Sequence, residues 1–443
     1  MGWLRSKGCL RPKGCIRKKG KGEGKRMSGR RADVIVIGAG VVGLSVAYYA
    51  SLKGAKVFVL EKGETGSGSS SGNAGLVVPS YFEPLPGPGV IGEAFKHLLS
   101  PEGFFGIRPR LDPSFLCWLA RFARSCNRRN FEARCRILAK LNDEALRAHL
   151  ELAEMGGQEY AFSQKGLLFL YLNEARLKEA RERASRAAGF GLRTEIITGD
   201  AVRRAEPTAG DRVVGGVRYF SDAGLNPLLF LEWLARRACA AGALITTQCE
   251  VYGFRTSGKR LRSVLTTKGE FQGDQVVLAA GAWLKNLGKL LGLKLPVEGG
   301  KGISQTFYGS CWSVEQPLIL DEHHVAVSPL PGALRVTGLL ELAGTDLTLS
   351  QRRVRGIRHA ACLYLPALRT MEPDEIWRGL RPCTPDGFPL VGRLSPWINV
   401  FVAGGHDTKG MSLGPLTGQY LSRLLAGESI GYAENELRPE RFL

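Results

Sequence analysis

The feature that most constrains this chain is an apolar run near its N-terminus that three glycines interrupt. Residues 34–52 carry no charge, which is close to the length a membrane-spanning helix needs. Residues 34–37, however, are β-branched, as in a buried parallel strand. Gly38, Gly40 and Gly43 follow, as a sharp turn into a helix requires. The pattern therefore predicts a strand, a turn and a helix of an α/β protein rather than a signal peptide or a membrane span.

The same turn matches the pattern G-x-G-x-x-G. Its first glycine permits the tight turn, its second lets backbone approach a pyrophosphate, and its third allows close helix–strand packing. The helix start presents free N–H groups and a partial positive charge to phosphates. The preceding strand and the following helix are the context that gives the pattern weight. It predicts a dinucleotide site whose candidate residues are Gly38, Ala39, Gly40, Val41, Val42 and Gly43.

An acidic residue follows the next predicted strand. Residues 56–60 form a mostly apolar run, and Glu61 and Lys62 stand directly after it. A carboxylate at this point accepts hydrogen bonds from both ribose hydroxyls and disfavours a 2′-phosphate. We therefore expect Glu61 and Lys62 to border the cofactor, and we do not expect NADP.

A loop of small residues comes next, reading GETGSGSSSGNAG over residues 63–75. Such a composition is typical of a flexible linker. A linker would not usually lead straight into an apolar strand such as the one predicted at 76–78. Serine hydroxyls and backbone N–H groups can instead wrap a cofactor, so Ser70, Asn73, Ala74 and Gly75 are candidates for binding it.

The rest of the chain alternates helix-like and strand-like segments. Helices are expected at 44–53, 132–155, 174–188, 227–241, 346–362 and 417–425. Strands are expected at 166–171, 243–247, 261–267, 271–280, 325–328, 334–338 and 398–403. The pieces between 296 and 350 fit an antiparallel sheet in a second domain. The strand at 271–280 ends in small residues, so Ala280 and Gly281 can pass close to a planar ligand.

Two stretches near the C-terminus are rich in glycine. Residues 377–392 read WRGLRPCTPDGFPLVG, and residues 404–415 read GGHDTKGMSLGP. The second leads into a predicted helix and so adds a second partial positive charge inside one fold. The ten cysteines form no Cys-x-x-Cys pair, so no metal site is expected. There is also no Ser-His-Asp or paired-carboxylate signature.

Four motifs in this order resemble the FAD-dependent D-amino-acid dehydrogenase (small subunit)/glycine oxidase family of the D-amino-acid oxidase-like superfamily. They read VIVIGAGVVGLSVAYYASLKGAKVFVLEK, SSSGNAGLVVPSY, GLRPCTPDGFPLVGR and GGHDTKGMSLGPLTG. The resemblance implies FAD as the cofactor. It implies an α/β fold with a Rossmann-like FAD-binding domain of the glutathione-reductase type. A second, α+β substrate domain would be built on an antiparallel sheet.

The expected division of the chain follows from the positions of these motifs. Residues 32–85, 220–295 and 376–435 would form the FAD-binding domain. Residues 86–219 and 296–375 would form the substrate domain, and residues 436–443 a tail.

The resemblance also implies roles for single residues. Arg381 would pair with the substrate carboxylate through its planar guanidinium, and His406 is the second catalytic candidate. Val251 would contact the adenine half of the cofactor. The residues that would face the flavin N1–C2=O edge, where positive charge stabilises reduced flavin, are Gly410, Met411 and Ser412.

Two departures from the family's pattern concern the substrate side of the site. Asp407 and Lys409 follow the histidine of the Gly-His turn, where small or apolar residues are usual. Ile303 stands where the dehydrogenases commonly have tyrosine. These positions bear on the substrate side chain and on reactivity with oxygen, but not on FAD binding.

The implied reaction is oxidation of the Cα–N bond of a D-amino acid or a cyclic imino acid such as D-proline or hydroxyproline. Arg381 would hold the carboxylate while a hydride passes from Cα to flavin N5, and no side-chain base is needed if the amine binds neutral. The expected electron acceptor is a quinone or another respiratory carrier. Two alternatives stay open: an oxygen-using glycine/sarcosine-type amine oxidase, and an FAD-binding subunit without independent activity.

The charge of the chain is unevenly distributed. Lys and Arg number 61 against 41 Asp and Glu, a net charge of +20. The first 31 residues carry twelve basic residues and one acidic residue, so this segment alone contributes +11. It has too little apolar content to fold by itself, and we expect residues 1–31 to form a disordered basic arm.

Three interpretations of the arm stay open. It can bind an anionic membrane surface, bind nucleic acid non-specifically, or be an inert extension of a chain whose translation starts at Met27. No specific nucleic-acid partner is expected. Scattered cysteines indicate a reducing compartment, so the expected location is cytoplasmic, with peripheral attachment to the inner face of the cell membrane as the added alternative.

Overall fold

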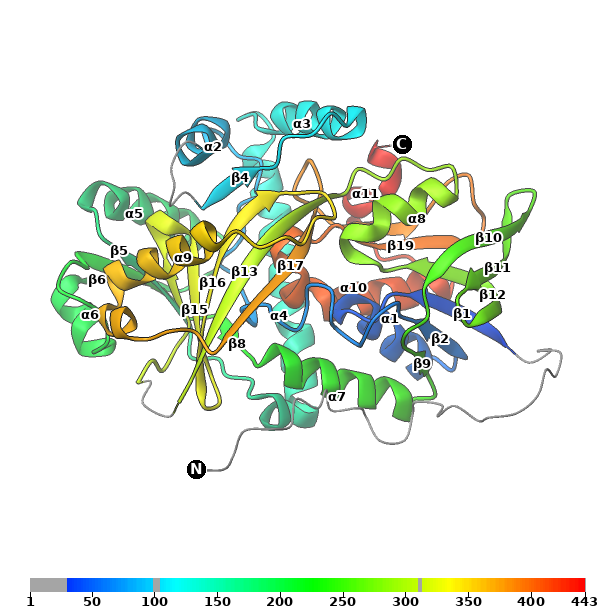
Figure 1. Ribbon diagram of the computed structural model, residues 1–443, viewed down its shortest axis with the longest axis horizontal. Coiled ribbons are helices and arrows are strands. Elements are labelled where there is room, and N and C mark those ends of the chain that lie inside the picture. Colours follow the sequence, from blue (N-terminus) through cyan, green and yellow to red (C-terminus); the bar gives the residue numbers. More distant parts are fainter. Residues whose placement is uncertain (1–29, 99–103, 310–312, 443) are drawn as a thin grey trace.

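The computed structural model describes residues 30–98, 104–309 and 313–442. Met27 and nearly all of the predicted arm at 1–31 lie outside these residues. The described chain forms two large sheets that lie side by side, each covered by helices (Figure 1). The expected α/β fold with a second, largely antiparallel sheet is confirmed.

The first sheet is built around β1 (Arg31–Ile37), which pairs in parallel with β2 (Val57–Leu60) and β12 (Gly269–Leu278). Val34 and Val36 enter the core on one face of the sheet, and Ile35 and Ile37 enter the core on the other. Burial on both faces explains the uninterrupted apolar run. The remaining strands are β9 (Leu244–Thr246), β10 (Val251–Ser257), β11 (Arg260–Thr266), β18 (Leu390–Arg393) and β19 (Val400–Gly404).

Three helices pack together on one face of this sheet: α1 (Val41–Leu52), α7 (Pro227–Ala240) and α10 (Gly410–Leu425). Helices α1 and α10 approach closely because Gly418 has no side chain. A Cβ at Gly418 would lie only 2.6 Å from the backbone of Ser45. Helix α8 (Leu284–Leu290) contributes Leu284 and Leu287 to the core on the opposite face.

The second sheet has the strand order β17-β13-β16-β15-β14-β5-β7-β6, with β4 beside β16. All of its neighbouring pairs are antiparallel except β14 with β5 and β16 with β4. Its strands are β4 (Phe105–Ile107), β5 (Leu167–Tyr171), β6 (Thr194–Thr198), β7 (Gly215–Tyr219), β13 (Glu298–Tyr308), β14 (Leu318–Leu320), β15 (Val325–Leu330), β16 (Ala333–Leu342) and β17 (Glu375–Cys383).

Helices cover both faces of the second sheet. Helix α9 (Gln351–Tyr364) packs Val354 and Ile357 into one core, and α5 (Glu174–Gly189) packs Leu177 into the other. The long helix α4 (Phe131–Gly156) runs against α10 and so reaches the first core. The other elements are α2 (Val90–Leu98), α3 (Pro113–Ser125), α6 (Gly199–Ala205), α11 (Tyr432–Leu437), β3 (Leu76–Val77) and β8 (Ala223–Gly224).

One strand lies in a different sheet from the one that the predicted domain division suggests. The range 376–435 assigns this part of the chain to the cofactor domain, whereas β17 pairs along its length with β13 of the second sheet. The chain returns to the first sheet only at β18. The sheet to which β17 belongs depends on backbone pairing between strands distant in sequence. The residues of β17 alone do not predict its partner strand.

Helix α10 begins at Gly410, well before the helix predicted at 417–425. Pro415 lies inside it and lacks the N–H that would bond to Met411 O. The imidazole of His149 in α4 replaces the missing donor. Its Nε2 lies 3.0 Å from Met411 O and 3.1 Å from Ser412 O. Both partners are acceptors, so Nε2 carries the proton, and burial lowers the pKa of His149 to about 4 and keeps the ring neutral.

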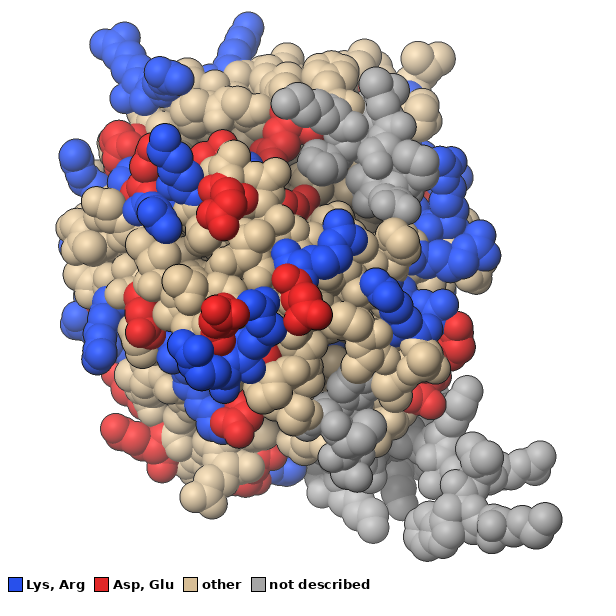
Figure 2. Space-filling view, turned by 90° about the vertical axis from the view of Figure 1, so that its left-hand side faces the viewer, with Lys and Arg blue, Asp and Glu red and all other residues tan. Residues whose placement is uncertain are grey.

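The surface seen in Figure 2 carries acidic and basic side chains interspersed. Ion pairs near the surface of the molecule include Arg186 with Glu83 and Arg203 with Asp200. Partly exposed pairs of this kind contribute little stability each. The face shown in Figure 2 carries no large patch of one sign. Among the described residues, no helix combines the length and the apolar character that crossing a membrane demands.

A buried carboxyl group beside β8 yields a testable pH dependence. Asp222, fully buried before β8, accepts hydrogen bonds from Ser80 N at 3.0 Å and Ser80 Oγ at 2.5 Å. Burial raises the pKa of Asp222 to about 7. The folded state therefore holds this proton more tightly than the unfolded chain, and the resulting stability of about 4 kcal/mol is lost as pH rises from about 4 to about 7. We expect the Tm to fall over this range by less in Asp222→Asn than in the wild type.

Calorimetry across the same pH range measures this difference. Asp143→Asn, which changes an exposed carboxylate of α4, is the matched control and should follow the wild-type curve. Identical pH slopes for Asp222→Asn and the wild type would contradict the assignment.

Candidate active site

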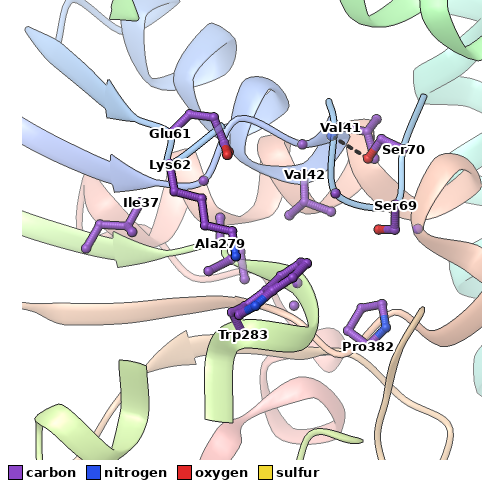
Figure 3. Close-up of a pocket in the computed structure, with 18 of the residues that line it drawn as sticks. Ile37, Val41, Val42, Glu61, Lys62, Ser69, Ser70, Ala279, Trp283 and Pro382 are labelled. Carbon is purple, nitrogen blue, oxygen red and sulfur yellow. Dashed lines mark hydrogen bonds between the residues drawn. The ribbon is translucent and has the colours of Figure 1, made fainter. Parts of the chain in front are cut away.

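The predicted cofactor residues converge on a cavity at the carboxyl ends of β1, β2 and β12. Its wall includes Ile37 at the end of β1, Leu60 at the end of β2 and Ala279 directly after β12. The second sheet contributes Arg381 and Pro382, so the cavity lies between the two domains. Figure 3 shows Val41 and Val42 on one side, together with Ser69 and Ser70 of the loop at residues 63–75, which we call the serine loop. Trp283 and Pro382 lie opposite them. Such a position at the ends of parallel strands is where α/β folds bind their ligands.

The glycine turn brings α1 against the strand ends. Gly38 has a φ of +113°, and a Cβ there would lie 2.5 Å from Ala279 O. A Cβ at Gly43 would overlap Gly38 O. Neither position admits a side chain, so the start of α1 sits directly at the cavity with its N–H groups directed toward it.

Glu61 organises the turn as well as bordering the cavity. Its Oε2 accepts a hydrogen bond from Ala39 N and its Oε1 accepts one from Gly63 N, both at 2.8 Å. The carboxylate thus holds the glycine turn and the following loop in a fixed relation. Each oxygen keeps a second lone pair for a ribose hydroxyl.

Lys62 and Trp283 form one side of the cavity. The ammonium of Lys62 lies 3.5 Å from the centroid of the Trp283 ring, and Figure 3 shows the two side chains together. Burial lowers the pKa of Lys62, while Glu61 and Glu250 oppose the shift. Sequence reasoning missed Trp283, although it directly follows the small residues after β12.

The serine loop is held from both sides. Ser70 Oγ accepts a hydrogen bond from Val41 N at 3.2 Å, which ties the loop to the start of α1. From the second sheet, Arg335 Nη1 donates to Ser71 O and Asn73 O, each at 3.1 Å. Ser328 Oγ donates to Ala74 O at 2.7 Å.

The sequence did not predict these contacts of Arg335 and Ser328 with the serine loop. Arg335 lies inside a strand that is buried almost throughout, and its guanidinium is itself mostly buried. A charged residue in the buried part of a mostly apolar strand is the signal that points to it. Its role in holding the loop depends on contacts between distant parts of the chain.

Arg381 projects from β17 beside a glycine of the neighbouring strand. A Cβ at Gly302 would overlap the Arg381 guanidinium, so glycine makes room for it. Nη1 donates to Leu339 O at 2.7 Å, and Leu339 has a left-handed φ of 71° near a register shift between β13 and β16. Burial lowers the pKa of Arg381. Within the described part of the chain its other N–H groups make no hydrogen bond.

The second glycine-rich turn brings the start of α10 to the same cavity. His406 is buried, its Nε2 lies 2.8 Å from Thr417 Oγ1, and burial lowers its pKa to about 3. The ring is therefore neutral at physiological pH. Gly410 and Met411 line the cavity, whereas Ser412 Oγ accepts a hydrogen bond from Val78 N at 3.2 Å.

A family model described as FAD dependent oxidoreductase matches residues 33–424. The chain belongs to this family. A protein named D-amino acid dehydrogenase from Bradyrhizobium diazoefficiens is 30% identical over 418 residues, covering 92% of this chain and 98% of its own. Another of that name, from Xanthobacter autotrophicus, is 32% identical over 407 residues, covering 89% and 96%.

Solved structures show the same fold. Glycine oxidase from Geobacillus kaustophilus matches with a TM-score of 0.77 at 23% identity, over 94% of this chain and 100% of its own. L-proline dehydrogenase from P. horikoshii matches with a TM-score of 0.72 at 22% identity, over 93% and 98%. At this level of identity the likeness is one of fold.

The enzyme is an oxidoreductase that uses FAD, and the cavity fits this cofactor. Two helix starts, those of α1 and α10, meet the cavity and offer N–H groups and partial positive charge to anionic groups. A Cβ at Gly40 would lie 3.2 Å from Ser70 Oγ, so a side chain there would narrow the passage between the turn and the serine loop. Glu61 lines the cavity directly after β2, where the sequence predicts a ligand of the ribose hydroxyls.

Most of the predicted site residues line this one cavity. They are Gly38, Gly40, Val41, Val42, Glu61, Lys62, Ser70, Asn73, Val251, Ala280, Gly281, Arg381, His406, Gly410 and Met411. Five others lie behind the lining and act on it through the backbone or through packing: Ala39, Gly43, Ala74, Gly75 and Ser412. Asp407, which departs from the family's pattern, lines the cavity as well.

The glycine turn gives a prediction about cofactor retention. Gly43→Ala places a methyl group against Gly38 O and should destabilise the protein by about 1–3 kcal/mol through overpacking. Displacing the turn should also lower the FAD content of the purified protein, measured by absorbance against protein concentration. Gly92→Ala is the control, because Gly92 lies in α2 with open space around it and alanine favours helix there. Equal FAD content and Tm in the two variants would refute the assigned constraint.

Proposed function

We propose that this enzyme oxidises the Cα–N bond of D-amino acids or cyclic imino acids. The observation that carries the proposal is the placement of Arg381 in the wall of the FAD cavity, with one N–H group bonded and the others free within the described chain. A planar guanidinium in this state suits a carboxylate, which it binds with two parallel hydrogen bonds. The relatives named D-amino acid dehydrogenase, similar over nearly their whole length, support the same reading.

In this proposal, bound FAD would supply the acceptor for the hydride of Cα, and the residues of the chain orient the substrate toward it. Arg381 fixes the carboxylate, and the hydrogen bond to Leu339 O fixes Arg381. His406, neutral and bonded to Thr417, holds the turn that leads into α10. Gly410 and Met411 present the helix start at which negative charge is stabilised. Holding the reacting atoms in place contributes much of the rate enhancement in such a site.

We also propose that electrons pass to a quinone or another respiratory acceptor rather than to oxygen. The support is the name dehydrogenase carried by the relatives of similar length. The basic segment 1–31 would bring the enzyme to an anionic membrane surface, where such acceptors reside, because each basic residue near the surface adds about 1 kcal/mol of attraction. In this proposal the enzyme works in the cytoplasm, on the inner face of the cell membrane.

Anaerobic mixing tests the reaction. We expect D-proline, D-hydroxyproline or D-alanine to bleach the flavin absorbance of the purified holoenzyme, because hydride transfer reduces the bound FAD. L-enantiomers are the control and should react far more slowly. A flavin that none of the D-substrates reduces would refute the proposed function. Stoichiometric peroxide release in air during turnover would refute the choice of acceptor alone.

Replacing the proposed carboxylate partner should separate substrate binding from cofactor binding. Arg381→Met should raise KM about 100-fold, since two hydrogen bonds to a charged group are lost, and leave the FAD content unchanged. Arg378→Met is the matched control on the same strand, because Arg378 is exposed and its Nε donates to Leu347 O. Steady-state kinetics with the best substrate measure both. An unchanged KM for Arg381→Met would remove Arg381 from its role.

A further inference from the structure

Asp407 is a buried carboxylate in the wall of the FAD cavity. Its exposed fraction is 4%, and it begins the short turn Asp407–Lys409 that leads into α10. Its φ of 53° is left-handed, a conformation that aspartate and asparagine adopt more readily than other side-chain-bearing residues. The mechanism outlined above makes no use of it.

The carboxylate of Asp407 lies on the same side of β17 as the guanidinium of Arg381. Residues two apart on a strand share a face, so Arg381 and Cys383 point the same way. Cys383 Sγ donates a hydrogen bond to Asp407 Oδ1 at 3.2 Å. The negative charge of Asp407 also raises the pKa of Arg381, opposing the effect of burial. The two charges therefore face a common space.

No ion pair joins Arg381 to Asp407, and neither pairs with any other charged group in the described part of the chain. Lys409, also buried, has no ion-pair partner there either. Unpaired buried charges are costly, and a ligand that carries both signs removes this cost for Arg381 and Asp407 together. An amino-acid zwitterion is such a ligand, because its carboxylate and its ammonium group are attached to the same Cα.

We propose that Asp407 binds the substrate ammonium group while Arg381 binds the carboxylate, and that Asp407 accepts the proton the amine must lose before oxidation. This proposal rests on the function proposed above. In the step, one N–H bond breaks and its electron pair stays on nitrogen. The proton forms an O–H bond with Asp407, and it passes to water after the product has left. Asp407 is then a catalytic residue that the binding of an already neutral amine would not require.

The titratable groups around Asp407 come from two elements. Arg381 and Cys383 lie on β17, and burial raises the pKa of the Cys383 thiol well above its ordinary value. His406 and Lys409 lie beside it in its own turn. The pKa of His406 is about 3, and burial lowers the pKa of Lys409 while Asp407 opposes that shift. Lys409 is therefore the neighbour whose titration must be distinguished from that of the substrate.

The wild-type enzyme alone supplies the first test. If Asp407 accepts the proton, kcat/KM is highest for the zwitterion and does not rise as pH passes through the pKa of the substrate amine. A unit-slope rise up to that pKa, measured with D-alanine and D-proline, would show that the neutral amine binds and would overturn the proposal. The amines of D-alanine and D-proline have different pKa values. If the rising part of the kcat/KM pH profile shifts from one substrate to the other, it reports the substrate amine rather than Lys409.

Asp407→Asn supplies the second test, since asparagine fits the left-handed backbone and keeps an acceptor for Cys383. We expect kcat/KM at pH 7 to fall about 100-fold and to recover with unit slope as pH rises, because only the neutral amine remains productive. Inhibition by D-lactate and by (R)-tetrahydrofuran-2-carboxylate, which lack an ammonium group, should change less than about threefold. Asp143→Asn, an exposed change on α4, is the control and should match the wild type.

The outcomes distinguish a failure of the role of Asp407 from a failure of the proposed function. A wild type whose flavin no amino acid reduces refutes the proposed function and this proposal with it. A reactive wild type with an Asp407→Asn variant of equal kcat/KM and equal pH profile refutes the role of Asp407 alone. Equal weakening of the amino acids and their ammonium-free analogues would mean that Asp407 only supports the fold of the turn, which also overturns the proposal.

Discussion

The close contact between the start of α1 and the end of β1 is the constraint on which the rest of the site depends. Backbone passes so near to backbone here that neither Gly38 nor Gly43 can carry a side chain. The contact sets α1 over the first sheet, and α10 packs on α1 with similar closeness at Gly418. Two helix starts thereby meet at one cavity, and their partial positive charges suit the anionic phosphates of FAD.

The second domain completes this site. Arg335 and Ser328 of the second sheet hold the backbone carbonyls of the serine loop, and Ser70 of the same loop holds the start of α1. Strand β17 belongs to the second sheet yet places Arg381 in the cavity wall. The cavity that fits the cofactor therefore lies between elements of both sheets. A shift of one sheet against the other would therefore move both the serine loop and Arg381, the proposed partner of the substrate carboxylate.

Much of the fold could be read from local pattern. The run at 34–37 is buried on both faces, the helix after Gly40 and the strand before Glu61 are where their residues predict, and Asn226 and Pro227 start α7 as an N-cap and first-turn proline should. The residue pattern predicts a helix only from residue 417, whereas α10 begins at Gly410 and contains Pro415. Its missing donor is replaced by His149, more than two hundred residues earlier in the chain, and no local pattern records that substitution.

By itself the sequence determined the glycine turn, the acidic residue after β2, the FAD family and about half of the cavity lining, because each depends on neighbouring residues or on motifs in a set order. Only the tertiary structure decided that β17 joins the second sheet, that Arg335 clamps the serine loop and that Asp407 shares a cavity with Arg381. These relations join residues far apart in the chain. They depend on strand pairing, burial and packing, which a single sequence does not state.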